Sequence, residues 1–304
     1  MTWRTPRCLT TRRAELFGEL TLKFFMFSRD GQTAVGVRTA GGFIDLTAAG
    51  LPATLDAMLA SGPDAIDRAE SIAKQTRRVE PVLGLRILTP LQKPSKAIAV
   101  GLNYVDHAAE IKATTPDYPV LFHRYPSSWV AHDEALQLPK VSNHFDYEGE
   151  LVVVIGKGGR YISKEHALDH VFGYSIFNDG TLRDYQFKSA QWMMGKNFDR
   201  SGAFGPEITT ADELPAGARG LRIQTRLNGR VVQSAVTTDM IFDVATLISI
   251  CSEPFALAPG DIIISGTPAG IGFSRNPPLF MKAGDRCEVE IEGVGTLRNA
   301  VAAE

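Results

Sequence analysis

The chain has 304 residues, of which 44% are apolar and 22% are charged, and its formal net charge at pH 7 is −2. This ordinary globular composition, with acids and bases interspersed, argues against a nucleic-acid-binding or membrane surface, and no apolar run is long enough to span a bilayer. The three cysteines, Cys8, Cys251 and Cys287, are far apart and form no CxxC pair. They argue against a disulfide framework or a thiolate metal site and fit a reduced compartment, so we expect a cytoplasmic protein.

Residues 1–21 differ from the rest of the chain. They are rich in arginine and threonine and have little hydrophobic periodicity. A transit peptide would also be rich in arginine, but Glu15 and Glu19 weaken that interpretation. We therefore expect a disordered extension, or a segment that precedes the true start of the protein, since a strand pattern begins at Leu22 and a methionine stands at position 26.

Residues 22–88 carry the pattern of a small N-terminal α/β domain. Strands are expected from Leu22 and over 34–37 and 42–46, between glycine-containing turns. Helical spacing follows over 55–59 and 64–74. The proline-containing segment 89–95 is expected to link this unit to a larger domain at 96–304.

The larger domain opens with a strand over 97–100 and a turn into a short helix for which Asn103 is a good N-cap. On that helix His107 and Glu110 are three residues apart and share a face. A histidine beside a carboxylate is the usual general-base pair, because the carboxylate orients the imidazole and stabilises its protonated form. Taken alone, however, the two residues are more simply a weak surface pair.

Three carboxylates lie at the ends of two expected strands. The run 151–155 is short, β-branched and bounded by glycines, which indicates a buried strand. Glu148 and Glu150 are two apart at its start, so both carboxylates lie on one face. Asp179 follows a second strand-like run at 171–178. Three oxygen ligands without Cys or His nearby suit Mg²⁺ or Mn²⁺ better than Zn²⁺, although each residue alone is more simply a surface or turn residue.

Lys196 follows the bulky cluster Trp192-Met193-Met194. This position predicts a partly dry cavity in which the ammonium can meet developing negative charge. An exposed loop lysine is the simpler alternative, and the cluster itself is expected in the core or at a dimer surface.

The last third of the chain is expected to be rich in strands. Asn228-Gly229 between the runs 221–227 and 231–236 is a strong two-residue hairpin signal, and 240–252 has the pattern of an amphipathic helix. A strand at 262–264 leads into the glycine-rich loop 265–272, which either binds a small carboxylate through its backbone N–H groups or simply connects two elements. Two further strands are expected at the C-terminus, over 287–291 and 295–299. Many strands with few helices predict a β-rich α+β fold.

Together these segments resemble the fumarylacetoacetate hydrolase family. The resemblance rests on six motifs in the family's order, Gly101-Leu102-Asn103-Tyr104-x-x-His107-x-x-Glu110, Phe122-x-Arg124, Glu148-x-Glu150-Leu151, Asn178-Asp179-x-Thr181-x-Arg183-Asp184-x-Gln186, Gly195-Lys196-x-Phe198-Asp199 and Gly266-Thr267-Pro268-x-Gly270. They cover the larger domain, and the small unit resembles the leading domain of bacterial members. The resemblance implies a β-roll of mixed sheets that is usually dimeric.

The resemblance also implies roles for individual residues. Glu148, Glu150 and Asp179 would bind Mg²⁺ or Mn²⁺. His107 and Glu110 would be a water-activating dyad, and Lys196 would stabilise charge at the cleaved carbonyl. The implied substrate-binding residues are Tyr104, Arg124, Arg183, Gln186 and Thr267. Many members carry lysine at the position of Arg124, and a bidentate donor there leaves open which anionic end of the substrate is bound.

The resemblance predicts a metal-dependent hydrolase that cleaves a carbon–carbon bond in a β-diketo acid, such as an acylpyruvate or a 2,4-diketo acid, in the catabolism of aromatic compounds or sugar acids. Two alternatives remain. The same enolate chemistry serves a decarboxylase or an enol–keto isomerase acting on oxaloacetate or a 2-hydroxydienoate. A non-catalytic metal- or keto-acid-binding module is a third reading, against which the dyad and Lys196 argue. The expected partners are a small anionic keto acid and a second copy of the chain, without nucleic acid or membrane.

Overall fold

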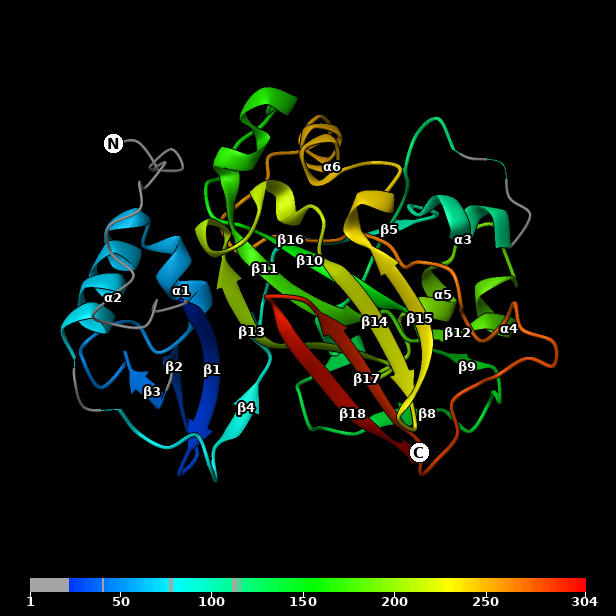
Figure 1. The fold of residues 1–304 in the computed structure, drawn as a ribbon, viewed down its shortest axis with the longest axis horizontal. Coiled ribbons are helices and arrows are strands. Elements are labelled where there is room, and N and C mark those ends of the chain that lie inside the picture. The colour runs from blue at the N-terminus through cyan, green and yellow to red at the C-terminus, as the bar shows by residue number, and fades with distance from the viewer. Residues whose placement is uncertain (1–21, 40, 77–78, 111–113, 115) are drawn as a thin grey trace.

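A computed structural model describes residues 22–304 except 40, 77–78, 111–113 and 115. The predicted extension over residues 1–21 lies outside the described residues. The described chain confirms the expected strand-rich α+β class, with mixed sheets that carry short helices at their edges (Figure 1).

The largest sheet has eleven strands and runs through both predicted domains. Its main path, in spatial order, is β3 (Gly42–Asp45), β2 (Gln32–Thr39), β1 (Lys23–Arg29), β13 (Gly202–Thr210), β11 (Val171–Asn178), β10 (Gly149–Ile155), β16 (Ile262–Ile264), β5 (Ala97–Gly101) and β6 (Val120–His123). Off this path, β4 (Arg86–Leu88) pairs with β1, and β7 (Trp129–Val130) pairs with β13.

Two smaller sheets complete the structure. A five-stranded sheet contains β15 (Arg230–Val236), β14 (Arg222–Leu227), β17 (Arg286–Ile291), β18 (Gly295–Ala303) and β8 (Leu136–Leu138), and a two-stranded sheet pairs β12 (Thr181–Leu182) with β9 (Phe145–Asp146). The predicted hairpin at Asn228-Gly229 is confirmed, and both residues have positive φ, 52° and 79°, as a two-residue turn of this kind requires.

Strand β10 is buried on both faces, which explains its unbroken apolar run. Leu151 and Val153 belong to a core shared with the five-stranded sheet. Val152 and Val154 point the other way, into a core that continues beneath the N-terminal unit. The start of β10, where the predicted carboxylates lie, is therefore held by packing from two sides.

The N-terminal unit joins the rest of the molecule by strand pairing. Strand β1 extends the large sheet through β13, with Lys23 opposite Thr209 and Phe24 opposite Ile208 (Figure 1). The segment 89–95 contains no helix or strand, as expected of a linker. The boundary between two domains at this segment stays a prediction, since the sheet and one apolar core cross it.

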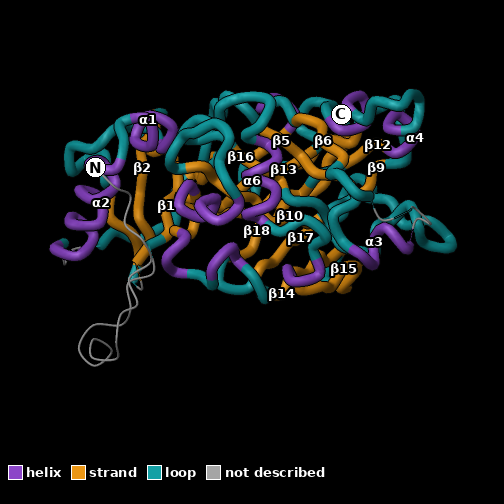
Figure 2. The backbone as a smooth tube through the Cα atoms, turned by 90° about the horizontal axis from the view of Figure 1, so that it is seen from above, coloured by secondary structure: helices purple, strands orange, loops and turns teal. Residues whose placement is uncertain are grey.

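The helices are short. They are α1 (Leu55–Ala60), α2 (Pro63–Gln75), α3 (Val105–Glu110), α4 (Arg183–Gln186), α5 (Met193–Lys196) and α6 (Val244–Cys251). Viewed from above, α1 and α2 lie against β1 and β2 at one end of the molecule and α3 lies towards the other (Figure 2). Within the described part of the chain, none of them has the length and apolar content needed to span a membrane.

The structure differs from the expected helices in two details. The helix predicted over 240–252 begins only at Val244, because the Asp243 side chain caps it by accepting the N–H of Thr246 at 2.8 Å. Asn103 is not placed as an N-cap. Its side chain instead donates to the carbonyls of Phe242 and Ser265, and it thereby ties the turn after β5 to the loop after β16.

Candidate active site

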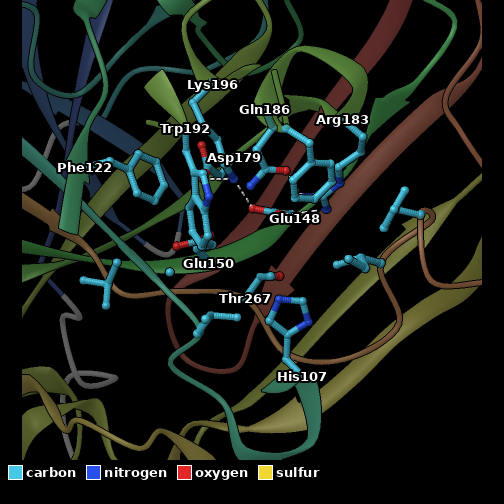
Figure 3. Close-up of a pocket in the computed structure, with 16 residues that line it drawn as sticks. His107, Phe122, Glu148, Glu150, Asp179, Arg183, Gln186, Trp192, Lys196 and Thr267 are labelled. Atoms are coloured by element: carbon cyan, nitrogen blue, oxygen red, sulfur yellow. Dashed lines mark hydrogen bonds and ion pairs between the residues drawn. The ribbon is translucent and has the colours of Figure 1, made fainter. Parts of the chain in front are cut away.

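A cavity of about 190 Å³ opens beside the start of β10 (Figure 3). Its lining brings together six titratable side chains from separate parts of the sequence, namely His107, Glu148, Glu150, Asp179, Arg183 and Lys196. Two polar side chains, Gln186 and Thr267, also line it. The remaining wall is largely apolar and includes four aromatic rings, Phe122, Phe187, Trp192 and Phe273.

Pairing between β10 and β11 brings the three carboxylates together. Gly149 lies opposite Asn178, and the N–H of Asp179 donates to the carbonyl of Glu148 at 2.8 Å. Each of Glu148, Glu150 and Asp179 is buried, and one oxygen from each lies within 4.8 Å of the others. We call these three residues the acidic triad.

The triad is compensated unevenly by positive charge. The Lys196 ammonium donates to Glu148 at 2.5 Å and to Asp179 at 2.6 Å, and an Arg183 nitrogen lies 2.6 Å from the other oxygen of Glu148. Glu150 has no ion pair among the described residues. Its hydrogen bond comes from the N–H of Gly266, at 2.5 Å.

This asymmetry separates the protonation behaviour of the two glutamates. Burial raises the pKa of Glu150 well above its ordinary range, and the neighbouring charges of Asp179 and Glu148 raise it further. Burial also acts to raise the pKa of Glu148, but Lys196 and Arg183 outweigh it and lower that pKa. The triad therefore holds one carboxylate whose negative charge lacks a partner.

The donor set fits a hard divalent cation. All three ligands are carboxylate oxygens, which Mg²⁺ and Mn²⁺ prefer. One oxygen from each residue lies within 4.8 Å of the others, so the three could hold one ion between them. Such an ion would also supply the positive charge that Glu150 lacks.

Arg124 does not line the cavity. Its guanidinium is buried behind Asp179, donates to an oxygen of Asp179 at 2.5 Å and to the carbonyl of Gly180 at 3.1 Å, and lies over the Phe177 ring. The structure shows Arg124 in contact with a triad residue, and its contact with substrate stays a prediction. Arginine suits this place because its several N–H groups can satisfy Asp179 and nearby carbonyls at once.

Arg183 and Gln186 line the cavity from α4. All three Arg183 nitrogens contact protein oxygens, of Glu148, of Gln186 at 2.9 Å and of Asp146 at 2.9 Å. Its Nη2 forms an ion pair with Glu148 but no hydrogen bond of good geometry, so Arg183 both orients its neighbours and keeps an unused donor at the site. Thr267 lines the opposite side, where its hydroxyl donates to the Gly149 carbonyl at 3.0 Å.

Tyr104 lies beneath the cavity wall and does not line it. Its side chain is fully buried, and its hydroxyl has no hydrogen-bond partner among the described residues. Burial and the charge of Glu150 raise the pKa of Tyr104, which keeps the hydroxyl protonated. Its role in substrate binding stays a prediction.

The His107–Glu110 pair lies on α3, across the cavity from Lys196 in the view of Figure 3. The imidazole Nδ1 is 3.4 Å from a Glu110 oxygen. An ionised carboxylate only accepts, so Nδ1 carries the hydrogen and Nε2 is left as the base. Burial acts to raise the pKa of Glu110, but hydrogen bonds from His107, Ser274 and the Gly270 N–H outweigh it and lower that pKa.

The glycine-rich loop after β16 does present N–H groups to carboxylates, but these carboxylates belong to the protein. The N–H of Gly266 donates to Glu150, and that of Gly270 donates to both oxygens of Glu110, at 3.0 and 3.1 Å. The N–H of Gly272 donates to Asp146 at 2.7 Å. These amides are therefore not free to bind a substrate carboxylate.

Comparison with known proteins decides the family. A sequence profile of the fumarylacetoacetate hydrolase C-terminal domain matches residues 96–302, which is about two thirds of the chain. The chain belongs to the fumarylacetoacetate hydrolase family.

Two relatives that share most of their length with this family member are named oxaloacetate tautomerases. The mitochondrial protein of Xenopus laevis is 37% identical over 269 residues, covering 87% of this chain and 84% of the relative. YisK of Bacillus subtilis is 38% identical over 263 residues, covering 83% of this chain and 87% of the relative.

Solved structures of the family share the fold. A fumarylacetoacetate hydrolase from Exiguobacterium antarcticum superposes with a TM-score of 0.81 at 36% identity, over 93% of this chain and 100% of that one. Maleylpyruvate hydrolase from Sphingobium sp. SYK-6, solved with manganese(II) and pyruvate, gives a TM-score of 0.77 at 27% identity, over 92% and 99%. Members named as hydrolases and members named as tautomerases thus both resemble this chain over more than four fifths of its length.

Two buried residues at the site were missed by the sequence reasoning. Asp146 binds Arg183 and the glycine-rich loop, and it stands two residues before Glu148 in the same alternation that placed Glu150. That spacing was a usable signal. Gln233 bridges the N–H of Gly149 and the hydroxyl of Thr267, and nothing local in the sequence marks it.

Proposed function

We propose that this family member catalyses the enol–keto tautomerisation of oxaloacetate or a closely related small 2-oxo diacid. The observation that carries the proposal is a buried histidine–carboxylate base facing an acidic triad across one small cavity. The names of the relatives in Xenopus laevis and Bacillus subtilis support oxaloacetate as the substrate. This function is the isomerase alternative of the sequence analysis, now preferred to hydrolysis.

The size of the cavity supports a small substrate. Its volume of about 190 Å³ lies below the roughly 300–1,000 Å³ of pockets that hold drug-sized ligands. A four-carbon diacid suits this space better than an acylpyruvate with a long acyl group.

Tautomerisation moves one proton between carbon and oxygen and consumes no water. In the direction from keto to enol, His107 Nε2 takes the proton from C3, and Glu110 stabilises the imidazolium that forms. The imidazolium then gives this proton to the oxygen that carries the enolate charge. A divalent cation held by Glu148, Glu150 and Asp179 would supply Lewis-acid stabilisation of that charge.

Two further features of the lining support this chemistry. The Lys196 ammonium is already directed at the triad, where it can stabilise negative charge on the same oxygen. Aromatic pairs flank the cavity, with ring centroids 5.4 Å apart for Phe187 and Phe273 and 5.7 Å apart for Phe122 and Trp192. These rings give the cavity a largely apolar wall around its charged end.

The test is to follow the ultraviolet absorbance of enol-oxaloacetate as it decays, with purified protein and added Mg²⁺ or Mn²⁺, and again after treatment with a chelator. We expect a metal-dependent acceleration over the uncatalysed rate, which His107→Ala removes. Pyruvate release is measured in the same samples, because it would reveal decarboxylation. Acceleration that survives in His107→Ala would refute the role of the dyad.

Hydrolysis of a carbon–carbon bond is the second candidate, because the manganese- and pyruvate-bound maleylpyruvate hydrolase shares the fold and a His–Glu pair can activate water. Acylpyruvates and fumarylpyruvate are therefore assayed in parallel. Cleavage of one of these, without acceleration of oxaloacetate tautomerisation, would replace the proposal by the hydrolase. Failure of every substrate to turn over, with metal binding intact, would favour a binding module.

A further inference from the structure

Asp146 is a fully buried carboxylate next to the cavity that does not line it. It is the last residue of β9 and pairs with Thr181 of β12, which stands two residues before Arg183. One of its oxygens accepts the N–H groups of Gly272 at 2.7 Å and Tyr147 at 2.9 Å. The other accepts the N–H of Phe273 and the Nε of Arg183, each at 2.9 Å.

These contacts lead in two directions. Towards the triad, Asp146 fixes the Arg183 guanidinium, whose outer nitrogen lies 2.6 Å from Glu148. Towards the dyad, Asp146 fixes Gly272 and Phe273, which belong to the same loop as the Gly270 amide that binds Glu110. One side chain therefore stands between a triad residue and the residue that orients the base.

The glycine-rich loop packs closely against neighbouring backbone, so it has little room to shift relative to Asp146. A Cβ at Gly272 would lie 1.9 Å from the Leu279 carbonyl oxygen and 2.6 Å from Asp146 itself. A Cβ at Gly270, whose φ is +102°, would lie 2.2 Å from the Val232 carbonyl oxygen. Glycine at these two positions permits the close approach that lets two amides of one loop reach two different carboxylates.

We propose that Asp146 is a positioning residue that couples Glu148 of the triad to Glu110 of the dyad. It thereby fixes the positions of the two halves of the site relative to each other. The link to turnover rests on the proposed function, since it requires both halves to act on one substrate. The link to the metal ligand does not. Asp146 touches no reacting atom and acts through Arg183 and the glycine-rich loop.

The competing explanation is that Asp146 only stabilises the fold, and the chain offers a matched control for it. Asp261 is equally buried, accepts the N–H groups of Lys96 and Ala258 at 2.8 Å each, and pairs with the Lys96 ammonium at 2.9 Å. It does not line the cavity. Asp146→Asn and Asp261→Asn each remove one buried charge while keeping the size of the side chain.

The experiment compares the two variants in the full chain by three measurements: calorimetric titration of chelator-stripped protein with Mn²⁺, kcat and KM for enol-oxaloacetate, and Tm. We expect Asp146→Asn to weaken Mn²⁺ binding about 10- to 100-fold, as for other residues that orient metal ligands, and to lower kcat more than it changes KM. Asp261→Asn should lower Tm alone. Equal Mn²⁺ affinity and kcat in the two variants would overturn the proposal.

The double variant Asp146→Asn/Glu110→Gln tests the branch towards the dyad. If Asp146 acts on turnover through Glu110, its loss should have little further effect on kcat once Glu110 is gone. Fully additive losses would overturn that branch. Arg183→Lys, which keeps the positive charge, is the second variant should Asp146→Asn not fold: an ammonium cannot contact Asp146 and Glu148 as the guanidinium does, so Mn²⁺ affinity should fall, and an unchanged affinity contradicts the coupling.

These outcomes also separate this proposal from the proposed function. If the unaltered protein turns over none of the substrates, the tautomerase assignment fails. The comparison of Mn²⁺ affinity between Asp146→Asn and Asp261→Asn still decides whether Asp146 positions the triad.

Discussion

The two halves of the cavity are built differently. The acidic triad comes from two neighbouring antiparallel strands inside a sheet that is buried on both faces. The dyad comes from α3, a helix of six residues, which is too short to be stable without tertiary contacts. Backbone pairing thus fixes the triad, whereas the dyad depends on a few side-chain and loop contacts such as those of Asn103 and Gly270.

This difference predicts which property a substitution on each side of the cavity should change. Substitutions on the triad side should change folding stability and metal affinity together, because ligands and core share the same strands. Substitutions on the dyad side should change turnover with little cost in stability, because α3 contributes few residues to the core. Four predictions test this difference between the two sides.

The largest effect is expected for His107→Ala. Removal of the base should lower kcat by about 10²- to 10⁴-fold, the usual contribution of general acid–base catalysis. Mn²⁺ affinity and Tm should stay close to those of the unaltered protein, as calorimetric titration and thermal melting would report. A large fall in Tm would mean that the dyad is also part of the structural core, and the contrast would fail.

Arg124→Ala should have the largest effect on stability. It leaves Asp179 as a buried charge without its arginine, so the free energy of unfolding should fall by about 3–5 kcal/mol in urea denaturation. The matched control is Arg29→Ala, which breaks the half-exposed pair with Glu80 and should cost about 0–1 kcal/mol. Similar losses in the two variants would show that the contact behind the triad is not important for folding.

Within the triad, Glu148→Gln and Glu150→Gln should have different effects on the stability of the metal-free protein. Glu148→Gln takes from both Arg183 and Lys196 one of their two carboxylate partners and should destabilise the chelator-treated protein. Glu150→Gln removes a carboxylate that has no cationic partner, so stability should stay equal or rise. Both should bind Mn²⁺ more weakly. Denaturation in the presence of a chelator checks the first pair of outcomes, and equal destabilisation by both would contradict the uneven compensation described above.

The smallest effect concerns pH. The pKa of Glu110 is lowered in the folded protein, so the ionised form is the one that folding favours. The stability that Glu110 contributes is therefore present in full above its unfolded pKa of about 4.5 and is lost as the pH falls through the lower, folded value. The stability difference between the unaltered protein and Glu110→Gln should shrink as the pH falls below about 4.5. A difference that grows below this pH would mean that the shift has the opposite sign.

Local sequence was enough for much of this structure. The strands β10 and β11, the Asn228-Gly229 hairpin and the shared face of Glu148 and Glu150 follow from periodicity and spacing, which are properties of neighbouring residues. That Asp179 joins these two glutamates depends on the pairing of β10 with β11, and the expectation of it rested on the family resemblance. The pairing of β1 with β13 joins residues about 185 positions apart, and no local pattern specifies it. Contacts of this range depend on the whole fold.

The partners of Arg124 and of the glycine-rich loop could not be identified from the sequence for the same reason. Arg124 was expected at the substrate, but its partner, Asp179, lies 55 positions along the chain. The glycine-rich loop was recognised as a donor of N–H groups, yet its acceptors Glu110 and Asp146 come from two other elements. Residue type gave the chemistry of these groups correctly, but only the packed structure assigns the partner.

The bond between β1 and β13 has a practical consequence for anyone who wishes to produce the catalytic region by itself. A fragment starting at residue 96 would expose the backbone edge of β13 at Ile208 and Thr209, and with it part of the apolar core that the N-terminal unit shares with the large sheet. Exposed strand edges with an apolar face recruit other chains, so such a fragment should aggregate rather than work as a smaller enzyme.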